Sequence, residues 1–557
     1  MNPTNHNRGL FIPLTVQHGA GLMVLLIALL FFPVPITAQP PEPEYHVYPV
    51  GNLADLEGDS QEIEALAAAV EKNKCPAVIV FSGDISKSDL TESSLRAQDS
   101  IRLSDIIRQL QSDLIIKLVF IPGDRDWSYS GRKGWENVTI LEGIVEALPF
   151  ENIKWTPGHG CPGPKEIDLA DHLTLVVINT QYWNHPYDKP SPADAVCKIS
   201  SPHDFMEELE DIIAEAGNKN VLIAGHFPVM SGGEYGGHMT IKKHLFPLTD
   251  VHPGLWIPLP AAGSFYPAYR KNVGSSMDII NENYEDFNAS IGNIFRDHPG
   301  LICISGHDYT TQLIYSGQSY FMNNGGMIHN KVAVKIKDNR YIGREKGLIR
   351  LEYLPNGDVM ATGFHLQNNA LVKGESMELY RSACLGPKDG IPVNEHYAPC
   401  NERTIFSEKM AAPFDQVVSV TGGAEYQASG FKSIFLGWHY RDSWTAAIQT
   451  RYLNLDTTFG GLTPIKRGGG RQTTSLKFRA GNGCEYVFRS VNKDPKKALS
   501  YELRETIVAD IIKDQTSTQQ PYGALATRNL LDTLEILHPS PHLYVLPPDD
   551  KLGPFRE

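Results

Sequence analysis

Five loops of the sequence carry polar side chains that could bind a metal ion or transfer a proton. Each loop follows an apolar run rich in Val and Ile, a pattern that predicts a buried strand. Carboxylate oxygens and imidazole nitrogens are common ligands of divalent transition metals in proteins. In chain order, the candidate residues and their motifs are Asn52 (VGN), Asp84 (SGD), Asp124, Arg125 and Asp126 (PGDRDW), His226 (GHFP) and His307 (SGHD).

Taken one at a time, these residues are weak signals. A Gly-Asp pair after a strand is common in turns, and a lone loop histidine is often only structural. Asp124 and Asp126 on either side of Arg125 would also suit a surface ion-pair cluster. The prediction of a site therefore depends on the ordered series of five loops.

The elements that must position these loops alternate between strands and helices. The sequence predicts strands over residues 45–51, 76–84, 115–124, 172–180, 220–226 and 301–307, and helices over residues 61–73, 93–111 and 203–217. This alternation is typical of an α/β fold, in which ligand sites gather at the carboxyl ends of parallel strands. We therefore expect the five loops to meet at one site.

The motif series resembles the calcineurin-like metallophosphoesterases, including the purple-acid-phosphatase-like members, over about residues 45–366. That family has Asp, Gly-Asp, Gly-Asn-His-Asp/Glu, Gly-His-x-Pro and Gly-His-x-His at successive strand ends. The stretches GCPGP and TQYWNHPYDKP resemble an exported subgroup found in Gram-negative bacteria. The resemblance implies an α/β/β/α sandwich, followed here by a smaller β-rich α+β domain.

The resemblance also implies a metal centre. Asp84 matches the aspartate that bridges two ions in the family, and Asp124 replaces an asparagine ligand. His226 and His307 match two of the histidine ligands. These four residues form the set that serves one ion of the family's pair, so the resemblance implies one divalent ion (Zn, Mn or Fe).

The ligands of the second ion are the ones that this sequence has changed. Asn52 stands where the family has its first aspartate, and Tyr309 stands where it has its last histidine. Tyrosine binds metal only as phenolate, and its free pKa is near 10. We expect one ion, with Asn52 as an additional ligand, and two ions remain the alternative.

Arg125 and Asp126 stand where the family has a catalytic histidine and its orienting carboxylate. Arginine stays protonated, so it cannot act as an acid and base. Two interpretations stay open: Arg125 binds an anionic oxygen through its planar fork, or it pairs with Asp124 and Asp126 and fills an emptied site. Losing a general acid slows catalysis by about two to four orders of magnitude. The sequence thus predicts slow hydrolysis of phosphate esters, or a non-catalytic binding or scaffold module of the cell envelope.

Composition sets limits on the partners and on the number of domains. The chain has 557 residues, enough for two or three domains. Its formal net charge is −14, its isoelectric point is near 5.8, and no block of basic residues stands out, which disfavours nucleic acid. The expected partner is a phosphate ester or another anionic small molecule.

The sequence divides into four predicted segments. Residues 1–38 resemble a cleaved signal peptide, because the apolar run at 21–32 is shorter than the roughly 20 residues of a spanning helix. An uncleaved anchor is the alternative. Residues 44–370 form the predicted metallophosphoesterase domain, 371–412 a linker, and 413–557 a β-rich α+β domain of unknown role. We expect an exported protein, in the periplasm, at the outer membrane or secreted, with a surface for an envelope protein in the last segment.

Seven cysteines make disulfides chemically feasible in an exported chain. The candidate pairs, both in loop-like sequence, are Cys161 with Cys197 and Cys384 with Cys400. Cys75 and Cys303 lie beside or within strand-like runs, so we expect them to be small buried hydrophobic residues.

Overall fold

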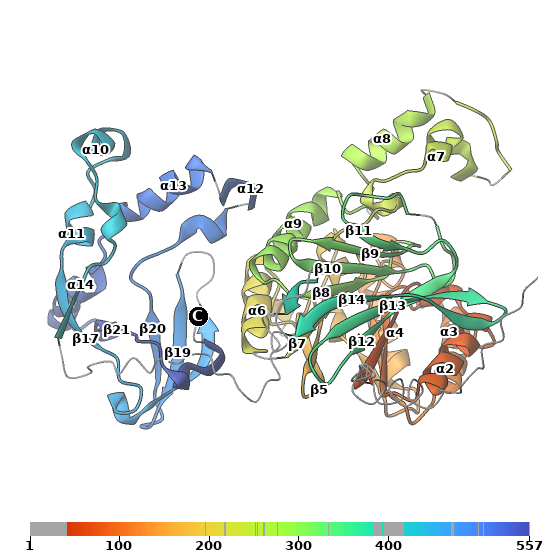
Figure 1. Ribbon diagram of the computed structural model, residues 1–557, viewed down its shortest axis with the longest axis horizontal. Coiled ribbons are helices and arrows are strands. Elements are labelled where there is room, and N and C mark those ends of the chain that lie inside the picture. Colours follow the sequence, from red (N-terminus) through yellow and green to blue (C-terminus); the bar gives the residue numbers. More distant parts are fainter. Residues whose placement is uncertain are drawn as a thin grey trace, which may run out of the picture. The chain divides into compact units, whose positions relative to one another are not determined.

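The fold is seen in a computed structural model, shown in Figure 1. The residues that it describes are 42–194, 196–216, 219–250, 252, 254–259, 262–275, 277–331, 333–382, 391–394, 417–468, 473–499, 501–504 and 506–555. The expected signal peptide and the expected pair of Cys384 and Cys400 lie outside these residues. Within them, no helix combines the length and the apolar character that crossing a membrane requires.

The first sheet has eight strands, in the order β15-β14-β13-β12-β1-β2-β3-β4. The four strands β1 to β4 run parallel, and β12 continues the sheet antiparallel to β1. Their bounds are β1 (Tyr45–Val50), β2 (Ala77–Ser82), β3 (Ile115–Ile121), β4 (Ile153–Trp155), β12 (Gly347–Tyr353), β13 (Val359–Gln367), β14 (Ala370–Ser382) and β15 (Val393–Asn394).

The second sheet has seven strands, in the order β11-β9-β10-β8-β7-β6-β5. Strands β6, β7, β8 and β10 are parallel, with antiparallel strands at both edges. Their bounds are β5 (Lys165–Ala170), β6 (Leu173–Val177), β7 (Asn220–Ala224), β8 (Ile302–Ser305), β9 (Thr311–Ser316), β10 (Ser319–Asn324) and β11 (Asn339–Ile342).

Helices cover the outer faces of the two sheets (Figure 1). On the first sheet they are α2 (Gln61–Asn73), α3 (Ser93–Gln109) and α4 (Gly134–Glu146), and on the second α5 (Thr180–Asn184), α6 (Pro202–Glu215) and α9 (Glu282–Asp297). Two short helices, α7 (Ile241–Leu245) and α8 (Phe265–Asn272), lie beside each other in the segment between β7 and α9.

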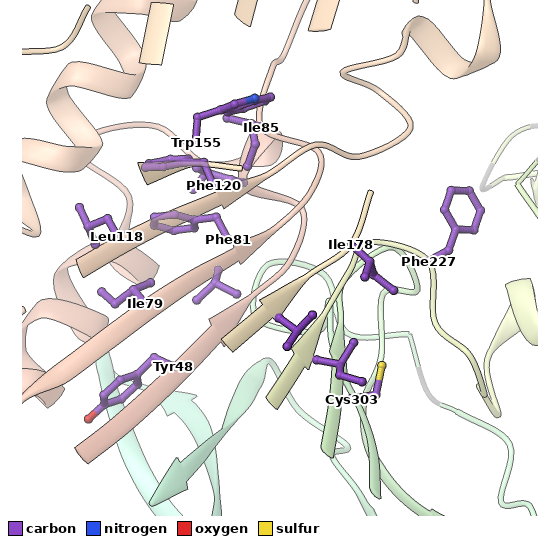
Figure 2. Close-up of a cluster of buried hydrophobic side chains, with 14 of the residues drawn as sticks. Tyr48, Ile79, Phe81, Ile85, Leu118, Phe120, Trp155, Ile178, Phe227 and Cys303 are labelled. Atoms are coloured by element: carbon purple, nitrogen blue, oxygen red, sulfur yellow. The ribbon is translucent and has the colours of Figure 1, made fainter. Parts of the chain in front are cut away.

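Alternating side chains of the strands explain this layering. In β1, Val47 faces the core between the two sheets, which also contains Leu222 and Ile304 of the second sheet. The next residue, Tyr48, points the other way, into the core under the helices. Figure 2 shows this second core, in which side chains from β1, β2 and β3 lie together on one face of their strands. The predicted fold class is therefore confirmed: the chain forms an α/β/β/α sandwich.

The structure corrects the predicted end of this sandwich at residue 370. Strand β14 (Ala370–Ser382) begins there and pairs antiparallel with β13, so the first part of the predicted linker belongs to the sheet. The first half of β14 is largely exposed, which gives it the polar composition of a linker. Leu379 and Tyr380, near its end, are buried in the core between the sheets.

Residues 417–555 form two further sheets of three strands each, β16-β17-β21 and β18-β19-β20. A small apolar core that includes Leu455 and Phe478 lies in this region. The strands are β16 (Val417–Val420), β17 (Ile448–Tyr452), β18 (Leu462–Gly468), β19 (Ser475–Ala480), β20 (Glu485–Arg489) and β21 (Tyr544–Val545), and the helices are α10 (Gly430–Leu436), α11 (Arg441–Thr445), α12 (Tyr501–Arg504), α13 (Ile507–Asp514) and α14 (Gly523–Thr533). This region has the predicted β-rich α+β character.

The predicted disulfide between Cys161 and Cys197 is present, and Cys75 and Cys303 are buried as expected. The bond closes a loop with a sequence separation of 36 residues. Restricting an unfolded chain in this way contributes about 4 kcal/mol to stability. We expect the double variant Cys161→Ser/Cys197→Ser to lose about that much free energy of unfolding and therefore to unfold at a lower urea concentration. Wild-type protein in reducing buffer should match it, and an unchanged midpoint in both samples would contradict this role.

Candidate metal centre

Four of the predicted loops meet where parallel strands of the two sheets end. Ser82 at the end of β2 pairs with Ile121 at the end of β3, so the loops that carry Asp84 and Asp124 leave the sheet at the same level. The second sheet supplies His226 just after β7 and His307 just after β8. The strand-end positions seen in the sequence therefore lie at one site.

The ligand atoms of these four residues are in direct contact. Oδ1 of Asp124 lies 2.7 Å from Nε2 of His226 and 3.1 Å from Nδ1 of His307. The two histidine nitrogens are 3.2 Å apart, and Oδ1 of Asp84 lies 3.4 Å from Nε2 of His226. One oxygen and two nitrogens thus converge on one point, and a second carboxylate borders it.

Backbone carbonyls fix the orientation of both imidazole rings. Nδ1 of His226 donates to the carbonyl oxygen of Ser82 at 2.8 Å, which leaves Nε2 as the free ligand atom. Nε2 of His307 donates to the carbonyl oxygen of Met277 at 2.8 Å, which leaves Nδ1. Metal-binding histidines generally have this kind of second hydrogen bond.

The electrostatics of the cluster favour a cation. All four side chains are buried. Burial raises the pKa of Asp84 well above its usual range, and the nearby charge of Asp124 adds to the shift. Burial acts the same way on Asp124, but His307 and His226 outweigh it and hold that pKa well below its usual range. A cation between the carboxylates would favour the ionised form of both.

A divalent ion fits the residues that are present. Oδ2 of Asp124 is buried and has no hydrogen-bond partner among the described residues, so this oxygen is free for a further ligand bond. Two imidazole nitrogens with carboxylate oxygens form a donor set suited to Zn, Mn or Fe.

Close backbone approach is built into the loops of the site. A Cβ atom on Gly83 would lie 2.1 Å from Nδ1 of His226, and one on Gly123 would lie 2.2 Å from the backbone nitrogen of Asp84. Gly83 also has a φ of +87°, which L side chains rarely adopt. Gly83 therefore allows a loop of the first sheet to approach His226 of the second, and Gly123 allows the loops after β2 and β3 to approach each other.

Arg125 does not pair as the sequence interpretation expected. Its Nη1 donates to Oδ1 of Asp55 at 2.7 Å, and its Nη2 donates to Oδ2 of the same carboxylate at 3.1 Å. Nη2 also donates to the hydroxyl of Tyr309, and Nε lies 3.4 Å from Oδ2 of Asp84. Of the two interpretations that the sequence left open, the one in which Arg125 pairs with Asp124 and Asp126 is wrong, because the guanidinium points toward the loop that follows β1.

Asp126 does not orient Arg125. Its carboxylate is fully buried and accepts hydrogen bonds from the backbone nitrogens of Ile85, Ser86 and Gly123 at 2.7–3.1 Å. Asp126 therefore holds the loops after β2 and β3 against each other from beneath the site.

The two positions at which the sequence has changed the family's second set of ligands, Asn52 and Tyr309, make hydrogen bonds to other groups. Asn52 is buried with a φ of +59°, and its Nδ2 donates to the carbonyl oxygen of Gly325 at 3.4 Å. The hydroxyl of Tyr309 contacts Asp55 at 3.2 Å. Burial raises the pKa of Tyr309, so the phenol stays protonated and is a poor metal ligand.

Two features of the site had no sign in the sequence pattern. Asp55 lies in a short 3₁₀ turn after Asn52 rather than at a strand end, so the motif series did not single it out. Tyr235 comes from the segment between β7 and α9, and its ring lies 4.3 Å from that of His307. Phe227 packs on the same histidine at 4.1 Å, so aromatic rings shield this ligand from solvent.

Arg102, on α3, holds the turn that carries Asp55. Its guanidinium donates to the carbonyl oxygens of Leu53 and Leu56 at 3.1 and 3.0 Å and pairs with the buried Asp99 at 2.7 Å. We expect Arg102→Ala to lower the free energy of unfolding by about 3 kcal/mol, because it leaves a buried charge unpaired.

The matched control for that variant is Arg108→Ala on the same helix. Arg108 pairs with Asp105 at the surface, and its side chain is 66% exposed, so its loss should change stability by less than about 0.5 kcal/mol. Urea denaturation of both variants checks the difference. Equal midpoints for the two would contradict the role of Arg102.

Comparisons with known proteins find only distant likenesses. No family model matches the chain, and no curated protein matches it. A purple acid phosphatase from yellow lupin (Lupinus luteus) seeds is 9% identical, with a TM-score of 0.38 over 60% of this chain and 53% of that one. The anchor in the inner membrane complex of Plasmodium is 13% identical, with a TM-score of 0.36 over 60% of this chain and 88% of that one. A protein of Streptococcus pneumoniae described as a predicted phosphoesterase is 10% identical, with a TM-score of 0.22 over 61% and 99%. At these values none of them bears on the chemistry of this chain.

Proposed function

We propose that the protein is an exported hydrolase of the metallophosphoesterase fold with a one-metal centre, and that it cleaves activated phosphate esters slowly. The observation that carries this proposal is the convergence of Asp124, His226 and His307, whose ligand atoms all lie within 4.8 Å of one another. Asp84 completes the set from the other side.

The residues of the chain have distinct roles in this proposal. Asp84, Asp124, His226 and His307 hold the ion. A bound divalent ion supplies charge neutralisation for a phosphoryl group and makes a water molecule more acidic. Arg125 cannot supply a proton to the leaving oxygen. Esters with a good leaving group need no such proton, so the substrate class is an anionic ester such as an aryl phosphate.

Export is supported by two observations. The N-terminal apolar run has the length of a signal peptide core. The disulfide between Cys161 and Cys197 would persist in an oxidising compartment and is uncommon in a reducing one. Both favour the periplasm, the outer membrane or the exterior as the location.

The test of the proposal is turnover of p-nitrophenyl phosphate by protein loaded with Zn, Mn or Fe. We expect slow, metal-dependent hydrolysis that Asp84→Ala and Asp124→Ala remove. Arg108→Ala, at the surface of α3, should leave the rate unchanged. Wild-type turnover no higher than that of the Asp84→Ala protein would overturn the hydrolase proposal.

A second candidate function is a non-catalytic binding module of the cell envelope. It is supported by Arg125, whose guanidinium is already engaged by Asp55, Asp84 and Tyr309 and has replaced the family's proton donor. Apolar side chains on and just after α10 add support for a protein partner in the C-terminal region, since Phe431, Phe435 and Trp438 are each more than 70% exposed. Metal binding without turnover would favour this function.

A further inference from the structure

Asp84 lies between the metal-binding cluster and the guanidinium of Arg125. Its Oδ1 faces Nε2 of His226 at 3.4 Å, on the side of the metal cluster. Its Oδ2 faces Nε of Arg125 at 3.4 Å, and Oδ1 also accepts a hydrogen bond from the backbone nitrogen of Arg125 at 3.1 Å. One carboxylate therefore borders the proposed ion with one oxygen and a guanidinium with the other.

The guanidinium of Arg125 is enclosed by oxygen atoms. Both oxygens of Asp55 accept hydrogen bonds from the guanidinium in a bidentate ion pair, and the hydroxyl of Tyr309 accepts a further hydrogen bond. The side chains of Arg125 and Asp55 are 19% and 21% exposed, so this pairing is only partly open to solvent. Asp55 and Asp84 raise the pKa of Arg125 although burial opposes them, so it stays charged.

The turn that carries Asp55 also carries the buried side-chain oxygen of Asn52. The backbone nitrogen of Asp55 donates to the carbonyl oxygen of Asn52 at 3.2 Å, which places the two residues in one tight turn. Oδ1 of Asn52 is buried and has no hydrogen-bond partner among the described residues. The turn therefore brings an unused amide oxygen as well as a carboxylate.

We propose that the guanidinium of Arg125 fills a second cation position formed by the carboxylates of Asp55 and Asp84, with Asn52 on the adjoining turn, and that shortening this side chain allows a second divalent ion to bind there. The proposal deepens the one-metal function above and rests on it for the first ion. It also explains why Arg125 is unsuited to binding a substrate anion, since its donors already face oxygen atoms of the chain. Carboxylate and amide oxygens make the position suitable for Mn.

The experiment counts ions bound to the full chain. Protein is stripped with a chelator, equilibrated with excess Mn²⁺, freed of unbound metal by gel filtration and measured by elemental analysis. We expect one ion per wild-type chain and two per Arg125→Ala chain. Arg125→Lys, which keeps a cation, and Arg125→Ala/Asp55→Ala, which removes a ligand, should each bind one.

Circular dichroism and thermal melting establish that each variant is folded, and Arg125→Ser serves in place of an alanine variant that does not fold. One ion in both wild type and Arg125→Ala would overturn this inference and leave the proposed function intact. No ion in wild type but one in Arg125→Ala, lost again with Asp55→Ala, would support the inference and overturn the proposed function. Two ions in wild type would overturn the inference.

Discussion

The variant His226→Ala is expected to lose more than about 100-fold in affinity for the divalent ion. Changes to residues that merely orient a metal ligand already cost about 10–100-fold, and His226 is itself a proposed ligand. Its Nε2 contacts both Asp124 and Asp84, so no other side chain can take its place. Because His226 is fully buried, the vacated space is closed to bulk solvent. Isothermal titration with Zn²⁺ or Mn²⁺ measures the loss.

A buried histidine outside the site provides the matched control. His46, in β1, is buried, and burial lowers its pKa to about 4, so it is neutral near pH 7. We expect His46→Ala to lower stability but to bind the ion as wild type does. Equal affinity of the His226→Ala and wild-type proteins would show that the ion binds elsewhere.

The variant Gly83→Ala is expected to lower both stability and affinity for the ion, although it removes no ligand. The added methyl group would lie 2.1 Å from Nδ1 of His226, and the backbone there has a φ of +87°. The left-handed backbone costs about 1–2 kcal/mol and overpacking about 1–3 kcal/mol, so the free energy of unfolding should fall by about 4 kcal/mol. The displaced ring would also point away from the ion, and affinity should fall by more than about 10-fold.

Gly143→Ala tests whether these effects are specific to the site. Gly143 lies in helix α4, and a Cβ atom there would meet nothing within 4 Å. Alanine in an exposed helix position should stabilise the protein by about 0.5–1 kcal/mol. Urea denaturation and metal titration of the two variants give the comparison. Wild-type affinity in the Gly83→Ala protein would contradict the close approach described here.

Much of the fold was predictable because burial imposes a regular pattern on the strands. The runs that became β1, β2, β3, β6, β7 and β8 are mostly apolar, since these strands are largely buried on both faces. The loops after these strands, except the one after β6, contain Gly followed by a polar residue, and the backbone passes closely at Gly83 and Gly123. The four converging residues were identified from this pattern, although their distances depend on how the two sheets pack.

The partners of Arg125 could not be predicted, because they depend on the direction of a long side chain. Nearest neighbours in sequence suggested Asp124 and Asp126, but those carboxylates face the histidines and the backbone nitrogens. Asp55 carries no motif and follows no strand, so only the three-dimensional structure brings it to the guanidinium. The direction in which a long, flexible side chain points does not follow from any periodic pattern in the sequence.

The segment between β7 and α9 was also beyond sequence reasoning. Tyr235 packs on the ring of His307, and Met277 accepts the hydrogen bond that fixes that ring. These contacts come from an irregular part of the chain, where neither helical nor strand periodicity applies. The exposed first half of β14 shows the same limit, since a strand outside the core has no apolar alternation.

The central claim is that a single divalent ion lies among Asp84, Asp124, His226 and His307 and that Arg125 excludes a second. Anomalous scattering from crystals grown with Mn²⁺ or Zn²⁺ locates every bound ion directly. The predicted result is one peak, about 2.0–2.3 Å from Nε2 of His226, Nδ1 of His307 and an oxygen of Asp124. A map with no peak at that point, or with a second peak beside Asp55 in the wild-type protein, would contradict the claim.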